Sequence, residues 1–139
     1  MNRLIVDTNI LVYLLTDTLD EDSDALVRDY EAQVFVSSVS VMEFIHLIQT
    51  GRVFINKKKD FDALEFIESS LGFRILYTSR EHLKQFESLP VVEGHNDPND
   101  RMIIAQAICE RLELLSSDTK FASYKKFGLN YIRSVHISK

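Results

Sequence analysis

Short apolar runs alternate with longer stretches of helical periodicity along the whole chain. The short runs are rich in β-branched residues, which predicts buried strands; they lie at 4–7, 34–38, 73–78, 114–118 and 130–135. The longer stretches predict helices at 9–16, 23–33, 40–51, 60–72, 80–89 and 97–113, with a further short helix that ends at Lys125. Strands that alternate with helices indicate βαβ units, so we expect a three-layer α/β/α fold with a mostly parallel five-stranded sheet.

The starts of the predicted helices carry recognisable capping signals. Asp22 or Ser23 is the expected N-cap of the second helix. Ser40 is followed three residues later by Glu43, which matches a capping box. Asp97 precedes a proline, and this favours it as the N-cap of the longest helix.

Length and composition are those of an ordinary globular domain. The chain has 139 residues, of which 45% are hydrophobic and 27% charged, so we expect a single domain over residues 1–139. Nothing at the start resembles a signal peptide, and the longest apolar run, 10–15, is too short to span a bilayer. The only cysteine, Cys109, lies in an apolar helical pattern, which indicates a buried reduced thiol in a cytoplasmic protein with no membrane partner.

The formal net charge is −5, which does not favour a protein that coats duplex nucleic acid, since such proteins carry an excess of Lys and Arg. An enzyme that holds nucleic acid through metal ions and a local basic rim remains open. Candidates for that rim are Arg52, Lys57, Lys58, Lys59, Arg101, Lys120, Lys125 and Lys126. Taken singly, each of these side chains is more simply interpreted as a solvated surface charge.

Acidic residues recur near the points where a predicted strand gives way to a helix; they are Asp7, Glu43, Asp100 and Asp118. Helix capping or the helix dipole explains each one singly. In a parallel sheet, however, the carboxyl ends of the strands lie along one edge, so these acids should be neighbours. Two carboxylates about 4 Å apart repel by roughly 4 kcal/mol at an effective dielectric constant near 20, so a converging set requires protonation or a cation. Oxygen ligands without His or Cys indicate Mg²⁺ or Mn²⁺.

Four segments resemble, in their order along the chain, the four acidic motifs of PIN-domain nucleases. They read VDTNILVY, SVSVMEFIHL, HNDPNDRMIIAQA and LLSSDTKFASY. The resemblance extends from Leu4 to about Ile132, and within the family it is greatest to the VapC-type toxins of bacterial and archaeal toxin–antitoxin pairs. It implies a PIN-like fold and a ribonuclease that uses Mg²⁺ or Mn²⁺.

The resemblance also implies roles for individual residues. The metal ligands and catalytic residues would be Asp7, Glu43, Asp100 and Asp118. Supporting positions would be Thr8, Asn9, Asp97 and Ser117, and possible RNA contacts are Arg52, Arg101 and Lys120.

The motif around the longest helix contains an ambiguity. Asp97 and Asp100 are three residues apart, so at helical spacing both could face the same side. The family pattern places the ligand directly before Arg101, at Asp100, which leaves Asp97 as an N-cap that could also contact a metal-bound water. His95 is either a substrate contact or a turn residue with no such role, and His46 is interpreted as packing or surface.

The expected reaction follows from the metal. Water activated by a metal ion does not need the ribose 2′-hydroxyl as nucleophile, so the products should carry 5′-phosphate and 3′-hydroxyl ends. The resemblance to VapC-type toxins further implies a small antitoxin partner and a homodimer. A housekeeping ribonuclease of the same family is the alternative, and the small size of the chain favours the toxin.

Other protein classes fit the sequence less well. A receiver domain needs an acidic pair near the first strand and an aspartate after the third, where this chain continues with Tyr77, Thr78 and Ser79. A haloacid-dehalogenase-type phosphatase needs Asp-x-Asp after the first strand, and Asn9 occupies the second of those positions. A PIN domain kept only as a binding module does not explain why all four acids are present.

Overall fold

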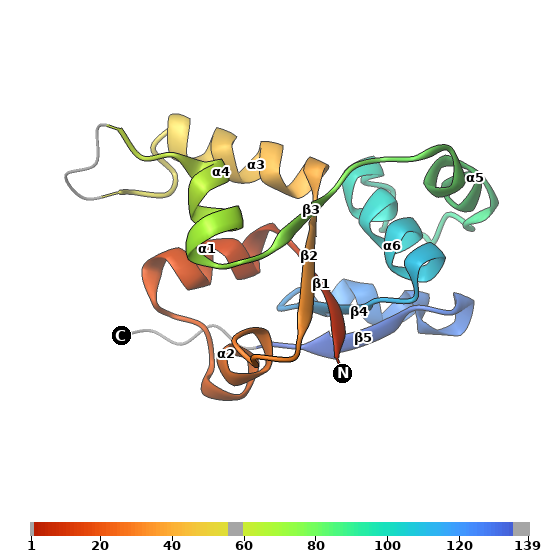
Figure 1. Cartoon of the computed structure of the whole chain (residues 1–139). Helices are drawn as coiled ribbons and strands as arrows, with labels where there is room; N and C mark the ends of the chain where they lie inside the picture. Colours follow the sequence, from red (N-terminus) through yellow and green to blue (C-terminus); the bar gives the residue numbers. More distant parts are fainter. Residues whose placement is uncertain (1, 56–59, 135–139) are drawn as a thin grey trace.

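The computed structural model describes residues 2–55 and 60–134 (Figure 1). Its strands are β1 (Arg3–Val6), β2 (Gln33–Ser37), β3 (Arg74–Leu76), β4 (Glu113–Ser116) and β5 (Asn130–Arg133). They form one sheet in the order β3-β2-β1-β4-β5, and every neighbouring pair is parallel. The predicted five-stranded α/β fold is confirmed, and the sheet is parallel throughout.

Helices cover both faces of this sheet (Figure 1). The α-helices are α1 (Thr8–Thr16), α2 (Glu21–Val27), α3 (Ser38–Gln49), α4 (Ala63–Glu65), α5 (Arg80–Ser88) and α6 (Pro98–Glu110). A π-helical turn, η1 (Phe66–Ser70), follows α4, and a 3₁₀ helix, η2 (Thr119–Phe127), follows β4.

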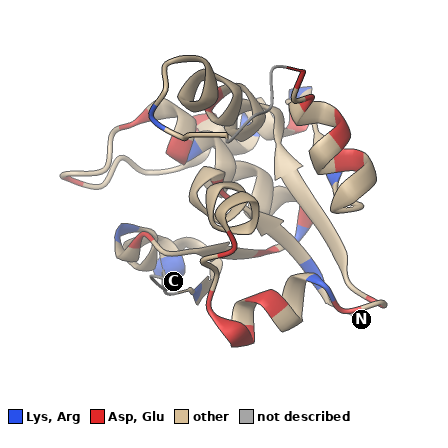
Figure 2. Ribbon diagram, turned by 90° about the vertical axis from the view of Figure 1, so that its left-hand side faces the viewer, with Lys and Arg blue, Asp and Glu red and all other residues tan. Residues whose placement is uncertain are grey.

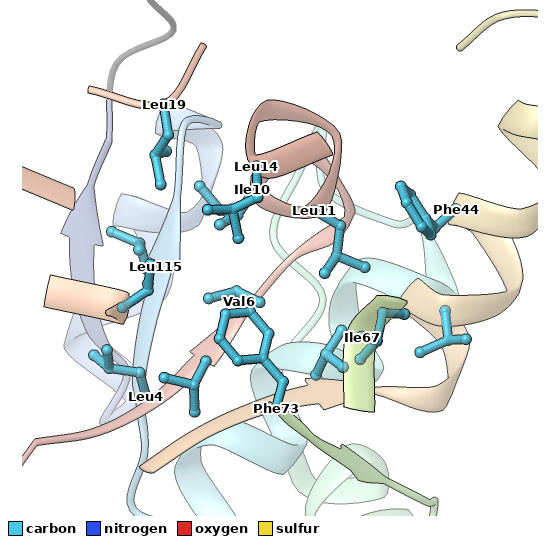
Figure 3. Packing of buried hydrophobic residues seen from close by; sticks show 14 residues of the cluster. Leu4, Val6, Ile10, Leu11, Leu14, Leu19, Phe44, Ile67, Phe73 and Leu115 are labelled. Atoms are coloured by element: carbon cyan, nitrogen blue, oxygen red, sulfur yellow. The ribbon is translucent and has the colours of Figure 1, made fainter. Parts of the chain in front are cut away.

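The central strand β1 contributes to two separate apolar clusters. Leu4 and Val6 pack with α1, α2, α3 and η1 on one face, in the cluster drawn in Figure 3. Ile5, which lies between them, packs with α6 and η2 on the other face. Successive side chains of a strand point to opposite faces, so an uninterrupted apolar strand is buried on both. This arrangement produces the three predicted layers.

The second predicted helix and the helix predicted over 60–72 differ from the structure. The second helix begins at Glu21, because the Asp20 carboxylate accepts the N–H of Ser23 at 3.0 Å and caps the helix. The prediction of Asp22 or Ser23 as its N-cap is therefore wrong. The segment 60–72 was expected to be one α-helix, and it holds only the short α4 followed by the π-helical turn η1.

The start of α3 also differs from its prediction. The helix begins at Ser38, directly after β2, and the Ser37 hydroxyl caps it by accepting the N–H of Val39 at 3.2 Å. Ser40 and Glu43 consequently form no capping box. Ser40 is a buried residue inside the helix, and Glu43 lies beyond the first turn, where its carboxylate is free to contact another element.

Two expectations about burial and membranes can be compared with the structure. Cys109, on α6, is a free thiol that is half-buried, so the prediction of a fully buried thiol is wrong. Among residues 2–55 and 60–134, no helix has the length and apolar character that crossing a bilayer requires.

Candidate metal centre

Asp7 lies at the carboxyl end of β1 and is the N-cap of α1. Its side chain is almost wholly buried, and its Oδ1 accepts the N–H of Ile10 at 3.3 Å. Its Oδ2 accepts the hydroxyl proton of Ser116 at 2.5 Å. The pKa of Asp7 is raised from 3.8 to about 7: burial is the main cause, the two hydrogen bonds oppose the rise, and the charges of Asp100 and Asp118 contribute to it.

Glu43 projects from α3 toward the start of α1. The Thr8 hydroxyl, in the first turn of α1, donates a hydrogen bond to Glu43 Oε1. Phe44, the next residue of α3, is fully buried in the core and fixes the orientation of the helix. The Glu43 carboxylate is therefore held at the carboxyl edge of the sheet although the residue remains exposed.

Asp97 and Asp100 occupy the first turn of α6, as the sequence predicts. Asp97 is the N-cap: its Oδ1 accepts the N–H of Asn99 at 2.8 Å and the N–H of Asp100 at 3.4 Å. Asp97 is exposed, whereas Asp100 is half-buried. The capping role of Asp97 is thus confirmed, and the carboxylate of Asp100 is not used in this cap.

The pKa of Asp100 reflects the presence of several other acids near it. Its pKa is raised from 3.8 to about 6, first by burial and then by the charges of Asp97, Asp118 and Glu43, while Lys120 lowers it. These acids come from three separate parts of the sequence. The expected gathering of acids at one edge of the sheet is therefore present in the fold.

Asp118 follows β4 and is the N-cap of η2, where its Oδ1 accepts the N–H of Lys120 at 2.9 Å. Its own N–H donates to Ser116 Oγ at 3.0 Å. Ser116 is fully buried and also donates to Asp7, so one hydroxyl connects the two acids. Ser116 was not among the predicted site residues, and no local signal marks it, because its bond to Asp7 depends on the pairing of β4 with β1.

Of the other residues predicted to support the acids, Thr8 and Asn9 follow Asp7 in the sequence and were the candidates to support it. Thr8 instead holds Glu43, as described above. Ser117 Oγ lies 3.0 Å from the hydroxyl of Tyr13, on α1, and Asn9 is exposed in the first turn of the same helix.

The acids fit a hard divalent cation by their chemistry. Two of them have raised pKa values because they are buried beside like charges, and a bound cation would relieve that repulsion. Within the described part of the chain, no three of them place one oxygen each within 4.8 Å of one another. Binding one shared ion through three of them would therefore require their side chains to move closer together.

Arg101 lines the same small pocket as Asp100 and Asp118, but its guanidinium is engaged in contacts with α5. Its guanidinium lies over the ring of Phe86 at 4.5 Å and donates to the carbonyl of Leu89 at 2.7 Å. These contacts tie the start of α6 to α5, so this side chain has a structural function that RNA binding would have to disrupt.

The other basic candidates lie on several elements (Figure 2). Lys120 is exposed in the first turn of η2, and Arg52 is exposed beyond the C-terminal end of α3. Lys125 and Lys126 are at the far end of η2, and Lys57–Lys59 lie outside the described residues. Of these, Lys120 is the one that affects the acids, through the pKa of Asp100.

A second group of potential ligands joins α5 to the end of α6. One ligand atom each from His82, Cys109 and Glu110 lie within 4.8 Å of one another. His82 Nδ1 accepts the N–H of Ser79 at 3.0 Å, so its Nε2 carries the proton and donates to Glu110 at 2.7 Å. With both ring nitrogens engaged, the imidazole has no lone pair for a metal. We interpret this group as a structural connection between the helices.

Comparison with known proteins agrees with this geometry. Residues 4–127 match the PIN domain family, and the chain therefore belongs to that family. Comparison with curated proteins by sequence found no match.

Solved structures with the same fold include VapC toxins of VapBC toxin–antitoxin systems. VapBC2 from Rickettsia felis, bound to a promoter DNA fragment, has a TM-score of 0.72 at 17% identity, over 96% of this chain and 99% of that one. VapBC-5 from Mycobacterium tuberculosis has a TM-score of 0.64 at 19% identity, over 96% and 99%. FitAcB from Neisseria gonorrhoeae has a TM-score of 0.64 at 22% identity, over 94% and 96%.

Proposed function

We propose that this protein is a Mg²⁺- or Mn²⁺-dependent endoribonuclease that hydrolyses RNA phosphodiester bonds. Its metal ligands and catalytic residues are Asp7, Glu43, Asp100 and Asp118. The observation that best supports this is that the acids meet at one edge of the sheet: Asp100 and Asp118 line one pocket, and burial together with the charges of these two residues raises the pKa of Asp7. A fold gains nothing from such repulsion unless a cation or a proton balances it.

Other residues of the chain hold and orient the four proposed ligands. Ser116 fixes one carboxylate oxygen of Asp7 and the backbone of Asp118, so these two ligands keep a constant relation. Thr8 orients Glu43, and the Asp97 cap sets the direction of α6 and hence of Asp100. A bound divalent ion would supply activated water and neutralise charge on the phosphodiester.

The single-domain arrangement and the structural neighbours extend the proposal. We infer one PIN domain over residues 1–139 that acts as the toxin of a toxin–antitoxin pair in the cytoplasm, as a homodimer that a small antitoxin inhibits. The support is the similarity in fold to structures of VapBC toxin–antitoxin systems. A housekeeping ribonuclease with the same site is the second candidate.

The nuclease proposal is tested by incubating purified protein with single-stranded RNA. Cleavage is expected with Mg²⁺ or Mn²⁺, with 5′-phosphate and 3′-hydroxyl product ends, and it should stop when EDTA removes the metal. Restoration of cleavage by excess Mg²⁺ controls for damage by EDTA. Undiminished cleavage in EDTA, or 2′,3′-cyclic phosphate ends, would contradict the proposed mechanism.

The toxin proposal is tested in growing cells. Induced expression is expected to arrest growth, and Asp7→Asn at an equal protein level should relieve the arrest, because it removes a ligand. Normal growth with the active wild-type enzyme would favour the housekeeping function. Arrest that persists with Asp7→Asn would show that cleavage is not its cause.

A further inference from the structure

We propose that His95 and Lys120 form a phosphate-binding subsite beside the four acids, which holds a phosphodiester group of the RNA while the acids hold the metal. This inference rests on the proposed nuclease function and adds to it the residues that bind the anionic part of the substrate. Both side chains line a small pocket, whose other lining residues are Asp100, Arg101, Ile104, Asp118, Phe121 and Tyr124. The guanidinium of Arg101 is engaged by Phe86 and Leu89, as described above.

His95 is held in this pocket by its neighbours. Its N–H donates to the carbonyl of Val92 at 2.8 Å, and its own carbonyl accepts the hydroxyl proton of Tyr124 at 3.1 Å. The imidazole meets the fully buried ring of Tyr124 edge to face, with centroids 5.9 Å apart and planes at 82°. A turn residue with its backbone and its ring both fixed is pre-organised for a ligand.

The hydrogen bonds of Ser123 indicate that Nε2 of the His95 imidazole is a hydrogen-bond donor. The Ser123 hydroxyl donates its only proton to the carbonyl of Lys120 at 2.7 Å. In its 3.4 Å contact with His95 Nε2 it must therefore be the acceptor, so Nε2 carries a proton. That contact is longer than most hydrogen bonds, so the N–H of His95 Nε2 can donate to a phosphate oxygen in place of Ser123 at little cost.

Lys120 supplies the positive charge. Its backbone is fixed on both sides, since its N–H donates to Asp118 and its carbonyl accepts from Ser123. Among the residues that the structure describes, no carboxylate oxygen lies within 4.0 Å of its ammonium, so it forms no ion pair there. Its charge nevertheless acts on Asp100. A cation beside several acids that pairs with none of them is available to a phosphate.

The two side chains would counteract the repulsion between RNA and a protein whose net charge is −5. RNA phosphates approaching an acidic edge meet repulsion, and an ion among the acids offsets it only at the scissile group. A fixed donor and an unpaired cation next to the ion would hold the adjacent phosphate oxygens. Their removal should therefore weaken RNA binding much more than metal binding or the chemical step.

The subsite is tested with two pairs of variants and a control. Lys120→Met removes the charge and Lys120→Arg keeps it; His95→Ala removes the donor and His95→Gln keeps an N–H donor. Lys126→Met, on the same helix and outside the pocket, is the control. The measurements are KM and kcat for single-stranded RNA at several salt concentrations, the Mg²⁺ concentration for half-maximal rate, the melting temperature, and anisotropy of labelled RNA in Ca²⁺.

Lys120→Met and His95→Ala are each expected to raise KM by about 10-fold with kcat changed less than about threefold, since a good phosphate contact contributes roughly 1–3 kcal/mol. Loss of one phosphate contact should also reduce the slope of log KM against log salt by about 0.7 for Lys120→Met. Lys120→Arg and His95→Gln should recover most of the loss. Lys126→Met should leave KM unchanged. None of the variants should change the Mg²⁺ concentration for half-maximal rate.

The outcomes separate the subsite from the nuclease. If wild-type protein cleaves RNA and the pocket variants match Lys126→Met in KM and in salt slope, the subsite is overturned and the nuclease stands. If wild-type protein binds RNA without cleaving it, and Lys120→Met and His95→Ala weaken that binding, the subsite stands and the nuclease does not. Wild-type protein that neither cleaves nor binds RNA overturns both.

Discussion

Asp100→Asn is expected to abolish RNA cleavage while leaving the fold intact, whereas Asp97→Asn, three residues earlier, should be nearly silent. Mutation of groups that merely orient metal ligands costs about 10–100-fold in activity, so loss of a charged ligand should cost at least as much. Asn retains the shape of Asp100, which is half-buried and takes no part in the helix cap through its side chain.

Asp97 has the opposite set of contacts. Its carboxylate accepts two backbone N–H groups, and asparagine caps a helix about as well as aspartate does. Asp97→Ala should cost roughly 1 kcal/mol of stability and reduce activity only through the position of α6. Melting temperatures and single-turnover cleavage at several Mg²⁺ concentrations measure both effects. If Asp97→Asn is inactive and Asp100→Asn is not, the ligand is Asp97.

Asp7→Asn is expected to stabilise the metal-free protein and to inactivate it. In the folded protein the pKa of Asp7 is raised from 3.8 to about 7, so between these values the folded state binds more protons than the unfolded state. Metal-free stability should therefore fall as the pH rises from 4 toward 7, and the raised pKa of Asp100 acts in the same direction. Asparagine carries no such charge, and its amide oxygen can still accept the N–H of Ile10 while its NH2 group donates to Ser116 Oγ.

The measurement is the free energy of unfolding in EDTA at pH 5 and pH 7.5, repeated with Mg²⁺. Wild-type protein should lose stability at the higher pH and regain it with Mg²⁺ by mass action on the folded state. Asp7→Asn should depend less on pH and respond less to Mg²⁺. Glu87→Gln, at an exposed position of α5, is the matched control. A less stable Asp7→Asn with an unchanged Mg²⁺ response would indicate that Asp7 is only a helix cap.

Sequence patterns predicted the sheet well because its signal is local. The run from Leu4 to Val6 is apolar at every position, and such a strand can be buried only if helices cover both of its faces. Asp97 was recognised as a cap because a proline follows it, and Asp7 was a candidate cap, with Thr8 as the alternative, because it lies between an apolar strand and an apolar helical pattern. The gathering of the acids followed from the topology of parallel strands rather than from any one motif.

The details that sequence reasoning missed depend on contacts between distant segments. Nothing local distinguishes Ser116, which bonds Asp7, from Ser117, which lies beside Tyr13. The false capping box at Ser40 arose because β2 passes into α3 without a connecting loop, so the helix starts before the pattern suggests. Local signals place an element to within a turn, and tertiary packing decides its first residue.

The order of strands in the sheet delays completion of the site during synthesis of the protein. β1 is made before the other strands of the sheet, yet one of its two hydrogen-bonded neighbours is β4, which is made after β2 and β3. Until α6, β4 and η2 have been made, Ile5 lacks the cover of α6 and η2, and Asp7 lacks the Ser116 hydroxyl, Asp100 and Asp118. Domains fold as they are translated, so the acidic edge is assembled only after η2 has left the ribosome. A ribosome making this chain therefore carries an incomplete site throughout the synthesis of the segments from β1 to η2.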